Sequence, residues 1–359
     1  MPHLRRVLVT GATGFVGSAL CEVLCSRGYG VIPVVQRGQR KPACCQEEIV
    51  VSDISDLPKI HRAFAFTDAV IHLAARAHIM RESAPDPLSA FRTTNVDGTI
   101  ALARAAAAAG VSRLVFVSSI GVNGAGSLTT CTRYSEEDGP APHDPYSRSK
   151  WEAEQALIEI ATATPMQVVR VRPPLVYGPS VPGNLLKLLH LIARGVPIPI
   201  TRNLRSFIGR ANLVDFLTVC LEHEAAANQL FVVSDGHDLS TEQLVRALCA
   251  GMGRPPRVFP VPLPVARIGA RVLGRRKFFA SAFGSLIVDS RKAHEVLGWS
   301  APVRAEDGLR ATAEWYRETW LQERHDHWPL HPAKNGSLPF SNGISTLPDS
   351  ATKRARRSL

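Results

Sequence analysis

The sequence predicts an α/β fold in which a doubly wound parallel sheet is joined to a smaller, mainly helical lobe. Short β-rich runs alternate with helical patterns through the first half of the chain, a glycine-rich turn follows the first run, and the alternation weakens beyond Tyr177. Such alternation is the signature of right-handed β-α-β units, whose strands pair in parallel. We expect residues 1–176 to form the sheet domain, 177–320 the lobe, with some chain returning to the sheet domain, and 321–359 a disordered basic tail.

Six short segments, rich in β-branched residues and bounded by turn residues, are expected to be the strands of the sheet. They are Arg6 to Thr10, Val31 to Gln36, Glu48 to Ser52, Ala69 to Leu73, Leu114 to Ser118 and Val168 to Arg172. The segments between them have helical patterns. These helices are expected at Val16 to Arg27, Leu57 to Ala65, Pro87 to Ala109 and Tyr146 to Ala163.

Beyond Tyr177, glycine and proline pairs interrupt the chain, and helices are expected to dominate. A returning strand pair is expected at Ser206 to Ile208 and Leu230 to Ser234. Ser240 and Gln243 have the spacing of a capping box and therefore predict the start of a helix.

Two later segments differ in composition from the rest. Between Val261 and Phe279, cations recur along an apolar stretch, which favours a helix packed on the lobe over one lying on a membrane surface. Gln322 to Leu359 lacks periodicity and ends in a basic run, which is typical of a disordered tail.

Composition restricts the partners of the protein. A net charge of +11 attracts polyanions, but aromatic residues make up only 6% and none interleave with a basic run, so we expect no nucleic-acid partner. No apolar run has transmembrane length, which predicts a cytoplasmic protein without stable membrane insertion. The seven cysteines form no CxxC pair and their number is odd, so neither a metal site nor a disulfide framework is expected.

Gly11, Gly14 and Gly17 follow the first expected strand and open the first expected helix. Glycines at this junction permit a tight turn and let backbone amides approach a pyrophosphate, whose charge the helix N-terminus stabilises. The arrangement predicts a Rossmann-type dinucleotide site. Its expected cofactor contacts are Gly11, Thr13, Gly14, Phe15, Val16 and Gly17.

The end of the second expected strand bears on the choice between NAD and NADP. An acid that would bind both ribose hydroxyls of NAD is absent there, and Arg37 stands in its place. A guanidinium can pair with the 2′-phosphate of NADP, so the sequence slightly favours NADP over NAD as the cofactor. The alternative is that Arg37 is a solvated cation of the loop. Asp53 and Ile54 are candidates to hold the adenine, although Asp53 also fits a turn cap.

Tyr146 and Lys150 are the strongest catalytic candidates because positions i and i+4 share one face of a helix. A neighbouring ammonium is expected to lower the pKa of the phenol, which suits Tyr146 to proton transfer. Ser119 ends the fifth expected strand, where its hydroxyl can meet the same substrate oxygen.

These residues resemble the extended short-chain dehydrogenase/reductases, the NAD-dependent epimerase/dehydratase family. The matching pieces occur in the family order between about Arg5 and Trp315. They are Thr10 to Gly17, Asp53, His72 to Ala75, Asn95 to Thr99, Val117 to Ser119, Tyr146 to Lys150, Arg172 to Pro174, Tyr177 to Pro179 and Leu297 to Trp299. The resemblance implies a homodimer and an enzyme that acts on a nucleotide-linked sugar.

The resemblance also implies roles for individual residues. Ser119, Tyr146 and Lys150 would form the catalytic triad, and Asn95 would support the lysine through a proton or water relay. Leu73, Ala74, Ala75 and Pro173 would line the cofactor, together with Tyr146 and Lys150. Ser119, Val122, Asn123, Asn184 and Arg205 would contact the substrate.

Within the family, the chain is similar to bacterial UDP-sugar enzymes of O-antigen synthesis, especially reductases that form UDP-N-acetylquinovosamine, and to UDP-glucose 4-epimerases. The chain departs from the family pattern in two places. Leu175 stands where epimerases often have asparagine. After Arg205 the family commonly has an aromatic residue or histidine followed by valine and aspartate, whereas this chain has Ile208 to Asn212. The first expectation is NAD(P)H-dependent reduction of a UDP-4-keto-6-deoxy-N-acetylhexosamine at C4. The alternatives are a UDP-sugar 4-epimerase and an inactive NADP-binding regulator.

Overall fold

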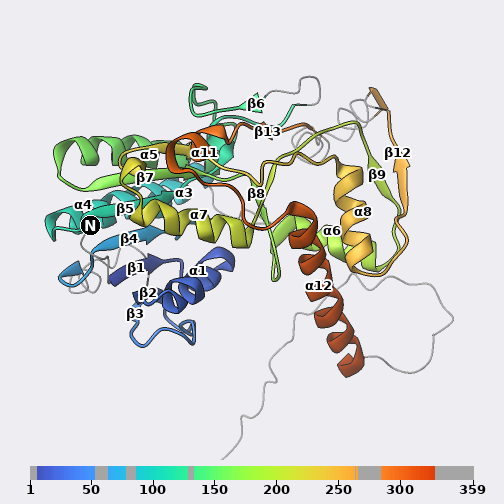
Figure 1. Cartoon of the computed structure of the whole chain (residues 1–359), viewed down its shortest axis with the longest axis horizontal. Coiled ribbons are helices and arrows are strands. Elements are labelled where there is room, and N and C mark those ends of the chain that lie inside the picture. The colour runs from blue at the N-terminus through green and yellow to red at the C-terminus, as the bar shows by residue number, and fades with distance from the viewer. Residues whose placement is uncertain are drawn as a thin grey trace, which may run out of the picture. The chain divides into compact units, whose positions relative to one another are not determined.

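A computed structural model describes residues 6–52, 64–77, 86–127, 133–262, 264–265 and 284–327 (Figure 1). The chain divides into two units, residues 1–320 and 321–359, and the sheet and the lobe belong to the first. No helix in these ranges is long and apolar enough to cross a membrane.

A seven-stranded parallel sheet forms the centre of the first unit. Its strands are β1 (Arg6–Thr10), β2 (Gly30–Gln36), β3 (Ile49–Val51), β4 (Ala69–His72), β5 (Arg113–Val117), β7 (Gln167–Arg172) and β11 (Leu230–Val232). Their order across the sheet is β11-β7-β5-β4-β1-β2-β3, which confirms the predicted fold class. The direction of winding reverses between β1 and β4, and ligands of such sheets bind at the carboxyl ends of the strands beside this point.

Two apolar cores hold helices against the sheet (Figure 1). On one face, α1 (Phe15–Ser26) and α7 (Arg210–Glu222) bury residues such as Leu20 and Phe216 against β1. On the other face, α4 (Gly98–Ala108) and α5 (Pro145–Ala163) bury residues such as Leu102 and Leu157 against β5. Burial on both faces explains why the strands are continuously apolar.

The single helix expected over Pro87 to Ala109 is interrupted. It consists of α3 (Pro87–Arg92), a π-helical turn η1 (Thr93–Asp97) and α4. A π-turn widens the helix locally and is frequent at functional sites. Here it contains Asn95, whose side chain is buried.

The lobe contains three helices around a separate apolar core. These are α6 (Gly183–Ala193), α8 (Thr241–Gly251) and the first turns of α12 (Ala305–His327). Ser240 and Gln243 form the predicted capping box at the start of α8. Two short strand pairs accompany the helices, β8 (Leu175–Tyr177) with β10 (Phe207–Gly209) and β9 (Ile198–Ile200) with β12 (Val258–Pro260).

The predicted pairing of the Ser206 and Leu230 segments is wrong. Both segments contain a strand, but β10 pairs with β8 while β11 extends the main sheet beside β7. Further short elements are β6 (Arg133–Tyr134), which pairs with β13 (Ile287–Val288), the 3-10 turns η2 (Ile120–Val122) and η3 (Glu224–Ala226), and α11 (Arg291–Leu297).

Several expectations fall wholly or mostly outside the described residues. These are the helix at Leu57 to Ala65, of which only residues 64 and 65 are described, most of the stretch Val261 to Phe279, and the tail beyond residue 327. The helix α12 continues to His327, past the boundary expected at residue 320.

Deletion of Lys334 to Leu359 is expected to leave the thermal midpoint of the protein nearly unchanged, because a segment without periodic apolar residues buries little surface. Differential scanning calorimetry of the full and shortened chains makes the comparison. A fall of about 5 °C or more would show that the segment packs on the folded unit.

Candidate active site

The glycine turn lies where the sequence predicts it, between β1 and α1. Gly11 has φ +68°, and a Cβ on it would come within 2.8 Å of the Ala74 nitrogen. A Cβ on Gly17 would come within 2.0 Å of the Gly11 carbonyl oxygen. Only glycine therefore fits this close packing of turn, helix and β4, and the first-turn amides of α1 open at the carboxyl end of β1.

The nucleotide end of the site begins after β2. Arg37 is exposed there, and its backbone amide donates to the Val51 carbonyl (3.0 Å). Gln39 accepts a hydrogen bond from the Thr13 hydroxyl (2.6 Å), which ties this loop to the glycine turn. Asp53 and Ile54, the expected adenine contacts, lie outside the described residues.

A capping box fixes the start of α5 and so places Tyr146 in its first turn. The Asp144 carboxylate accepts from the Ser147 amide (2.7 Å), and the Ser147 hydroxyl accepts from the Asp144 amide (3.2 Å). Pro145 occupies the first helical position, where its missing N–H costs nothing. The Tyr146 ring packs edge-on against Phe91, with 6.1 Å between ring centroids.

Lys150 is buried one turn later in α5. Its ammonium donates to the Val117 carbonyl (2.8 Å) and lies 4.5 Å from the centroid of the Phe116 ring. Ser119 follows two residues after Val117, and its Oγ accepts from the Gly121 amide (3.1 Å). The end of β5 therefore carries both the acceptor for Lys150 and the hydroxyl of Ser119.

The ionisation of the pair differs from the sequence prediction. Burial, together with the nearby Asp144, raises the pKa of Tyr146 to about 12, so the expected lowering by a cation is not present in the protein alone. Burial also lowers the pKa of Lys150 to about 7. Burial has the largest effect on both pKa values because it disfavours the charged forms, the phenolate of Tyr146 and the ammonium of Lys150.

Asn95 contacts the residue before Lys150 rather than the lysine itself. Its Nδ2 donates to the Ser149 hydroxyl (2.9 Å) and to the Arg76 carbonyl (3.2 Å), while its Oδ1 accepts from the Arg76 amide (2.8 Å). These bonds join the π-turn η1 to α5 and to the segment after β4. The relay to Lys150 remains a prediction.

A buried histidine, to which the sequence analysis gave no role, links the same elements. His72 Nδ1 lies 2.6 Å from the Thr10 hydroxyl, and its Nε2 lies 2.9 Å from the Thr99 hydroxyl. Because Thr99 donates its proton to the Asn95 carbonyl (2.7 Å), Nε2 must carry the histidine proton and Nδ1 must accept from Thr10. Burial lowers the pKa of His72 to about 3, so the ring stays neutral.

The residues after β4 and β7 line the same edge of the sheet. The Ala74 amide donates to the Thr10 hydroxyl (3.2 Å), and Leu73 and Ala75 flank it. Pro173 is buried after β7, and its carbonyl accepts from the Ile120 amide (3.0 Å). Leu73, Ala74 and Ala75 thus lie at the switch point and Pro173 lies beside the end of β5, and their contacts with a dinucleotide stay a prediction.

A buried ion pair supports the strand ends below Ser119. Arg172 Nε and Nη2 donate to Glu154 Oε1 (2.9 Å) and Oε2 (2.5 Å), and neither side chain is appreciably exposed. The Ser118 hydroxyl donates to the same carboxylate. The bidentate geometry connects α5, β7 and the end of β5.

The predicted substrate contacts fall into two groups. Val122 and Asn123 are buried, and the Asn123 amide is engaged by Arg172 (2.9 Å) and by the Ser135 carbonyl (2.9 Å), which gives its side chain a structural role. Asn184 is exposed in the first turn of α6. Arg205 donates to the Gly284 carbonyl (3.2 Å), and burial lowers its pKa.

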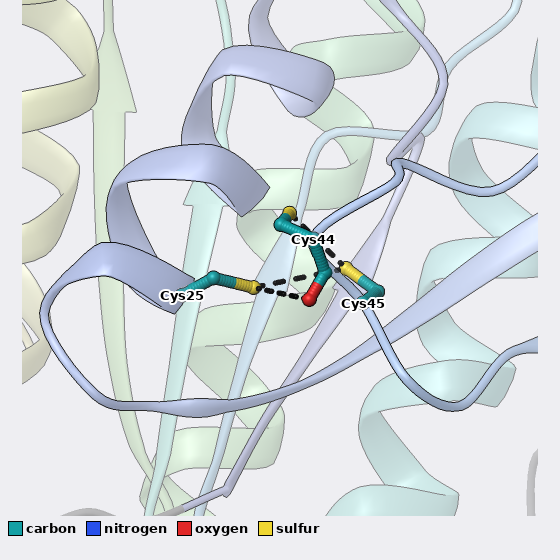
Figure 2. A group of neighbouring side chains, drawn as sticks. All are labelled: Cys25, Cys44 and Cys45. Atoms are coloured by element: carbon teal, nitrogen blue, oxygen red, sulfur yellow. Dashed lines mark hydrogen bonds between the residues drawn. The ribbon is translucent and has the colours of Figure 1, made fainter.

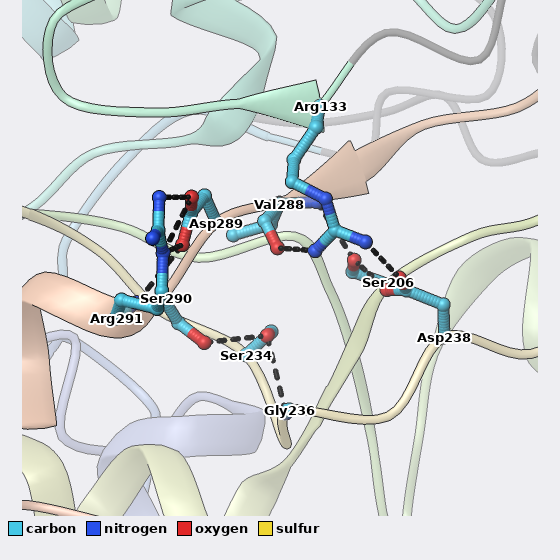
Figure 3. A network of polar contacts seen from close by, with 9 residues as sticks. All are labelled: Arg133, Ser206, Ser234, Gly236, Asp238, Val288, Asp289, Ser290 and Arg291. Atoms are coloured by element: carbon cyan, nitrogen blue, oxygen red, sulfur yellow. Dashed lines mark hydrogen bonds and ion pairs between the residues drawn. The ribbon is translucent and has the colours of Figure 1, made fainter.

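A polar network includes Ser206, the residue after Arg205 (Figure 3). Arg133 bonds Asp238 (3.2 Å) and the Val288 carbonyl (3.4 Å), and Asp238 accepts from the Ser206 hydroxyl (2.5 Å). The network continues through Ser234, Gly236, Asp289, Ser290 and Arg291. It connects β6, β13 and the segment before β10. The backbone next to Arg205 is therefore bonded, through Ser206, to the neighbouring elements.

Arg210 is a second residue to which the sequence analysis gave no role. It belongs to the Ile208 to Asn212 departure, and its guanidinium carbon lies 5.2 Å from the centroid of the Phe15 ring at the start of α1. Gly178 makes room for it, because a Cβ there would come within 2.9 Å of the Arg210 Cβ. Asn212 of the same segment bonds Asp235 (2.7 Å), which also accepts from the Tyr177 hydroxyl (2.6 Å).

A Rossmann-type sheet with a glycine turn after β1 is the fold of nicotinamide-dependent enzymes, and Ser119, Tyr146 and Lys150 stay the predicted triad. Residues 7–234 match the model of the NAD dependent epimerase/dehydratase family, and the chain belongs to that family.

Named relatives give the comparison more detail. The chain is 39% identical to UDP-glucose 4-epimerase of Vibrio cholerae over 314 residues, which cover 86% of this chain and 95% of that protein. It is 26% identical to the structure of UDP-glucose 4-epimerase from Thermotoga maritima with UDP-glucose, with a TM-score of 0.70 over 88% of this chain and 99% of that one. It is also 26% identical to MoeE5 with UDP-glucuronic acid and NAD, with a TM-score of 0.71 over 88% and 99% of the two chains.

These comparisons revise two expectations. None of these three relatives is named as a 4-ketoreductase, and the two whose names give a reaction are 4-epimerases, so they support the alternative expectation better than the first. The neighbour solved with a nicotinamide cofactor holds NAD, which lends no support to a preference for NADP. The enzyme class and the use of a nicotinamide cofactor stand.

Proposed function

We propose that the protein is a UDP-sugar 4-epimerase that works with a resident NAD. The observation that carries the proposal is the 39% identity that extends over 95% of the Vibrio cholerae epimerase. The gathering of Ser119, Tyr146 and Lys150 at the carboxyl edge of the sheet supports it, since the reaction needs a proton-transfer group beside a nicotinamide.

The residues present fit the cofactor. The turn at Gly11 and Gly17 keeps the start of α1 close to β4, so the helix amides offer a binding place for a pyrophosphate. Arg210, against Phe15, adds a cation near this end of α1. Leu73, Ala74 and Ala75 follow β4 beside the same turn and would line the nicotinamide half.

In the proposed reaction, the side chains transfer the proton of the C4 hydroxyl and form hydrogen bonds with its oxygen. Tyr146 removes and returns the proton of the C4 hydroxyl, while Ser119 donates a hydrogen bond to the same oxygen. Lys150, held by the Val117 carbonyl, orients the cofactor ribose and favours the ionised phenol. NAD, when bound, supplies hydride exchange at C4. The keto sugar then presents its other face before the proton is returned.

The residues that bind the substrate are proposed to lie on the lobe. Arg205 offers a partly buried guanidinium suited to a diphosphate, and the next residue, Ser206, is bonded into the network of Figure 3. Asn184, in the first turn of α6, is proposed to contact the nucleotide. The domain division assigns the cofactor to residues 1–176 with returning segments such as β11, and the substrate to the lobe in residues 177–320.

The test is an interconversion assay with the purified protein. UDP-galactose and UDP-N-acetylgalactosamine are supplied separately without added cofactor, and the products are identified by NMR. We expect the C4 epimer of at least one sugar at many turnovers per chain. Activity that appears only with added NADH or NADPH, and that consumes it stoichiometrically, would contradict the proposal.

A second candidate is the NADPH-dependent reduction of a UDP-4-keto-6-deoxy-N-acetylhexosamine. The observation that favours it is the end of β2, where Gln36, Arg37, Gly38 and Gln39 include no acid to bind both ribose hydroxyls of NAD. A net reduction requires an exchanging cofactor, and an NADP(H) pool would supply it.

A variant of Arg37 tests whether the protein uses NAD, as the proposed epimerase would, or NADP, as the reductase would. For the epimerase with resident NAD, Arg37→Ala should change NADH and NADPH affinities in parallel and by less than about 0.5 kcal/mol, because an exposed cation with no phosphate partner contributes little. Isothermal titration of both cofactors gives the ratio. A selective loss of about 1.5 to 3 kcal/mol for NADPH would instead favour the reductase, since that is the scale of a charge-assisted hydrogen bond.

We also propose a homodimer formed through α4 and α5. A hollow of about 470 Å³ lies between these helices. It is lined largely by small and aliphatic side chains, among them Ile100, Ala107, Ala156 and Ile160. An isologous interface would bury this hollow against its own copy. Light scattering should give twice the mass of the chain, and Ala156→Glu should give the monomer.

A further inference from the structure

Four of the seven cysteines gather at one edge of the sheet domain. Cys21 and Cys25 lie one turn apart in α1, and Cys44 and Cys45 are adjacent in the segment between β2 and β3. Their spacing in the sequence contains no CxxC pair, so only the fold reveals that they meet. Figure 2 shows the thiols of Cys25, Cys44 and Cys45 converging.

Two of the three distances between the sulfur atoms are close to those between the ligands of a zinc ion. The Sγ atoms of Cys44 and Cys45 are 3.7 Å apart, those of Cys25 and Cys45 are 4.0 Å apart, and all three lie within 4.8 Å of one another. Ligands 2.3 Å from a tetrahedral zinc ion lie about 3.8 Å from each other. Small movements of the side chains would therefore bring the three sulfurs to the spacing that such an ion requires.

We propose that Cys25, Cys44 and Cys45 bind a thiophilic divalent metal ion, with Zn²⁺ as the expected ion. The three thiolates leave a fourth position of the ion to water or to a further ligand. Thiolates select zinc and similar soft ions over magnesium or calcium, which prefer oxygen. This proposal departs from the expectation of no metal site, which was based on the spacing of the cysteines in the sequence.

The three thiols are not bonded to one another in the structure. The sulfur atoms of both neighbouring pairs are nearly twice as far apart as the roughly 2.05 Å of a disulfide. Binding of a metal ion would displace the thiol protons and stabilise the thiolates.

The site would connect α1 to the loop that leaves β2. That loop contains Gln39, which accepts from Thr13 of the glycine turn (2.6 Å). A metal ion held by Cys25 from the helix and by Cys44 and Cys45 from the loop would fix the backbone on both sides of the cofactor turn. Its role is therefore structural, and its binding does not depend on which sugar the enzyme uses.

The experiment uses the full chain, purified under reducing conditions and treated with a chelator. Zn²⁺ is added and bound metal is counted by mass spectrometry, and Co²⁺ serves as a spectroscopic probe. We expect one ion per chain, the thiolate-to-cobalt charge-transfer band, and a rise in thermal midpoint of about 3 to 6 °C.

Cys44→Ser is the decisive variant because Cys44 is exposed and its replacement should not disturb the core. It should weaken zinc binding at least tenfold and diminish the charge-transfer band. Cys249→Ala, a buried cysteine of the lobe, serves as the control and should bind as the unaltered chain does. Absence of the band, unchanged binding in Cys44→Ser, or a loss of two titratable thiols without metal would each overturn the proposal.

Discussion

Tyr146→Phe is expected to lower turnover by about two to four orders of magnitude, the usual loss when a general acid or base is removed. The substitution deletes one hydroxyl and keeps the ring, which packs against Phe91 (6.1 Å between centroids). The folded state should therefore be nearly unaffected. Steady-state kinetics with a saturating UDP-sugar measures the loss as a change in kcat.

Tyr29→Phe is the matched control. Tyr29 precedes β2 at the amino edge of the sheet, and its hydroxyl donates to Glu222, away from the proposed site. It should lose about 1 kcal/mol of stability or less and keep its turnover. Equal turnover in Tyr146→Phe and the unaltered enzyme would remove Tyr146 from the chemistry.

Glu154→Gln is expected to lower the free energy of unfolding by about 3 to 5 kcal/mol. The carboxylate is fully buried and pairs with Arg172 through two hydrogen bonds of 2.9 and 2.5 Å. Glutamine leaves the buried guanidinium without a counter-charge and weakens the acceptor for the Ser118 hydroxyl. Urea denaturation followed by circular dichroism gives the difference.

Glu152→Gln, two residues earlier in α5, provides the comparison. Glu152 also pairs with arginines, Arg92 (2.6 Å) and Arg148 (3.2 Å), but at the surface. Solvent screens such pairs, so the expected cost is below about 1 kcal/mol. Similar losses in the two variants would show that the buried pair has no special role in holding the strand ends together.

Much of the fold follows from local sequence. The boundaries of β1 coincide with the expected segment, and those of β2, β3, β4, β5 and β7 differ by one residue at one or both ends, because apolar runs end sharply at turn residues. The partners of β10 and β11 were not predictable in this way, since neither strand contains information about the strand beside it. The π-turn at Asn95 likewise depends on a tertiary contact, the bond to Ser149.

The residues of the candidate site could be predicted from the sequence, whereas their pKa values and hydrogen bonds could not. The motifs identify Tyr146, Lys150 and the glycine turn, but the pKa of Tyr146 depends on how deeply the ring is buried in the folded chain. His72 stands within a recognised motif, yet its bonds to Thr10 and Thr99 appear only when β1, β4 and α4 are in place. The thiols of Cys25 and Cys45 are 20 residues apart in sequence and meet only through the loop after β2.

Retention of the C4 hydrogen tests epimerisation most directly. UDP-galactose or UDP-N-acetylgalactosamine, whichever the protein converts, is supplied with deuterium at C4 in ordinary water without added cofactor, and the C4 epimer formed is examined by NMR and mass spectrometry. We predict that the product keeps its deuterium at C4, because the hydride is returned to the carbon from which it came. No C4 epimer of either sugar in the absence of added NADPH, or product with ordinary hydrogen at C4, would contradict epimerisation with a resident NAD.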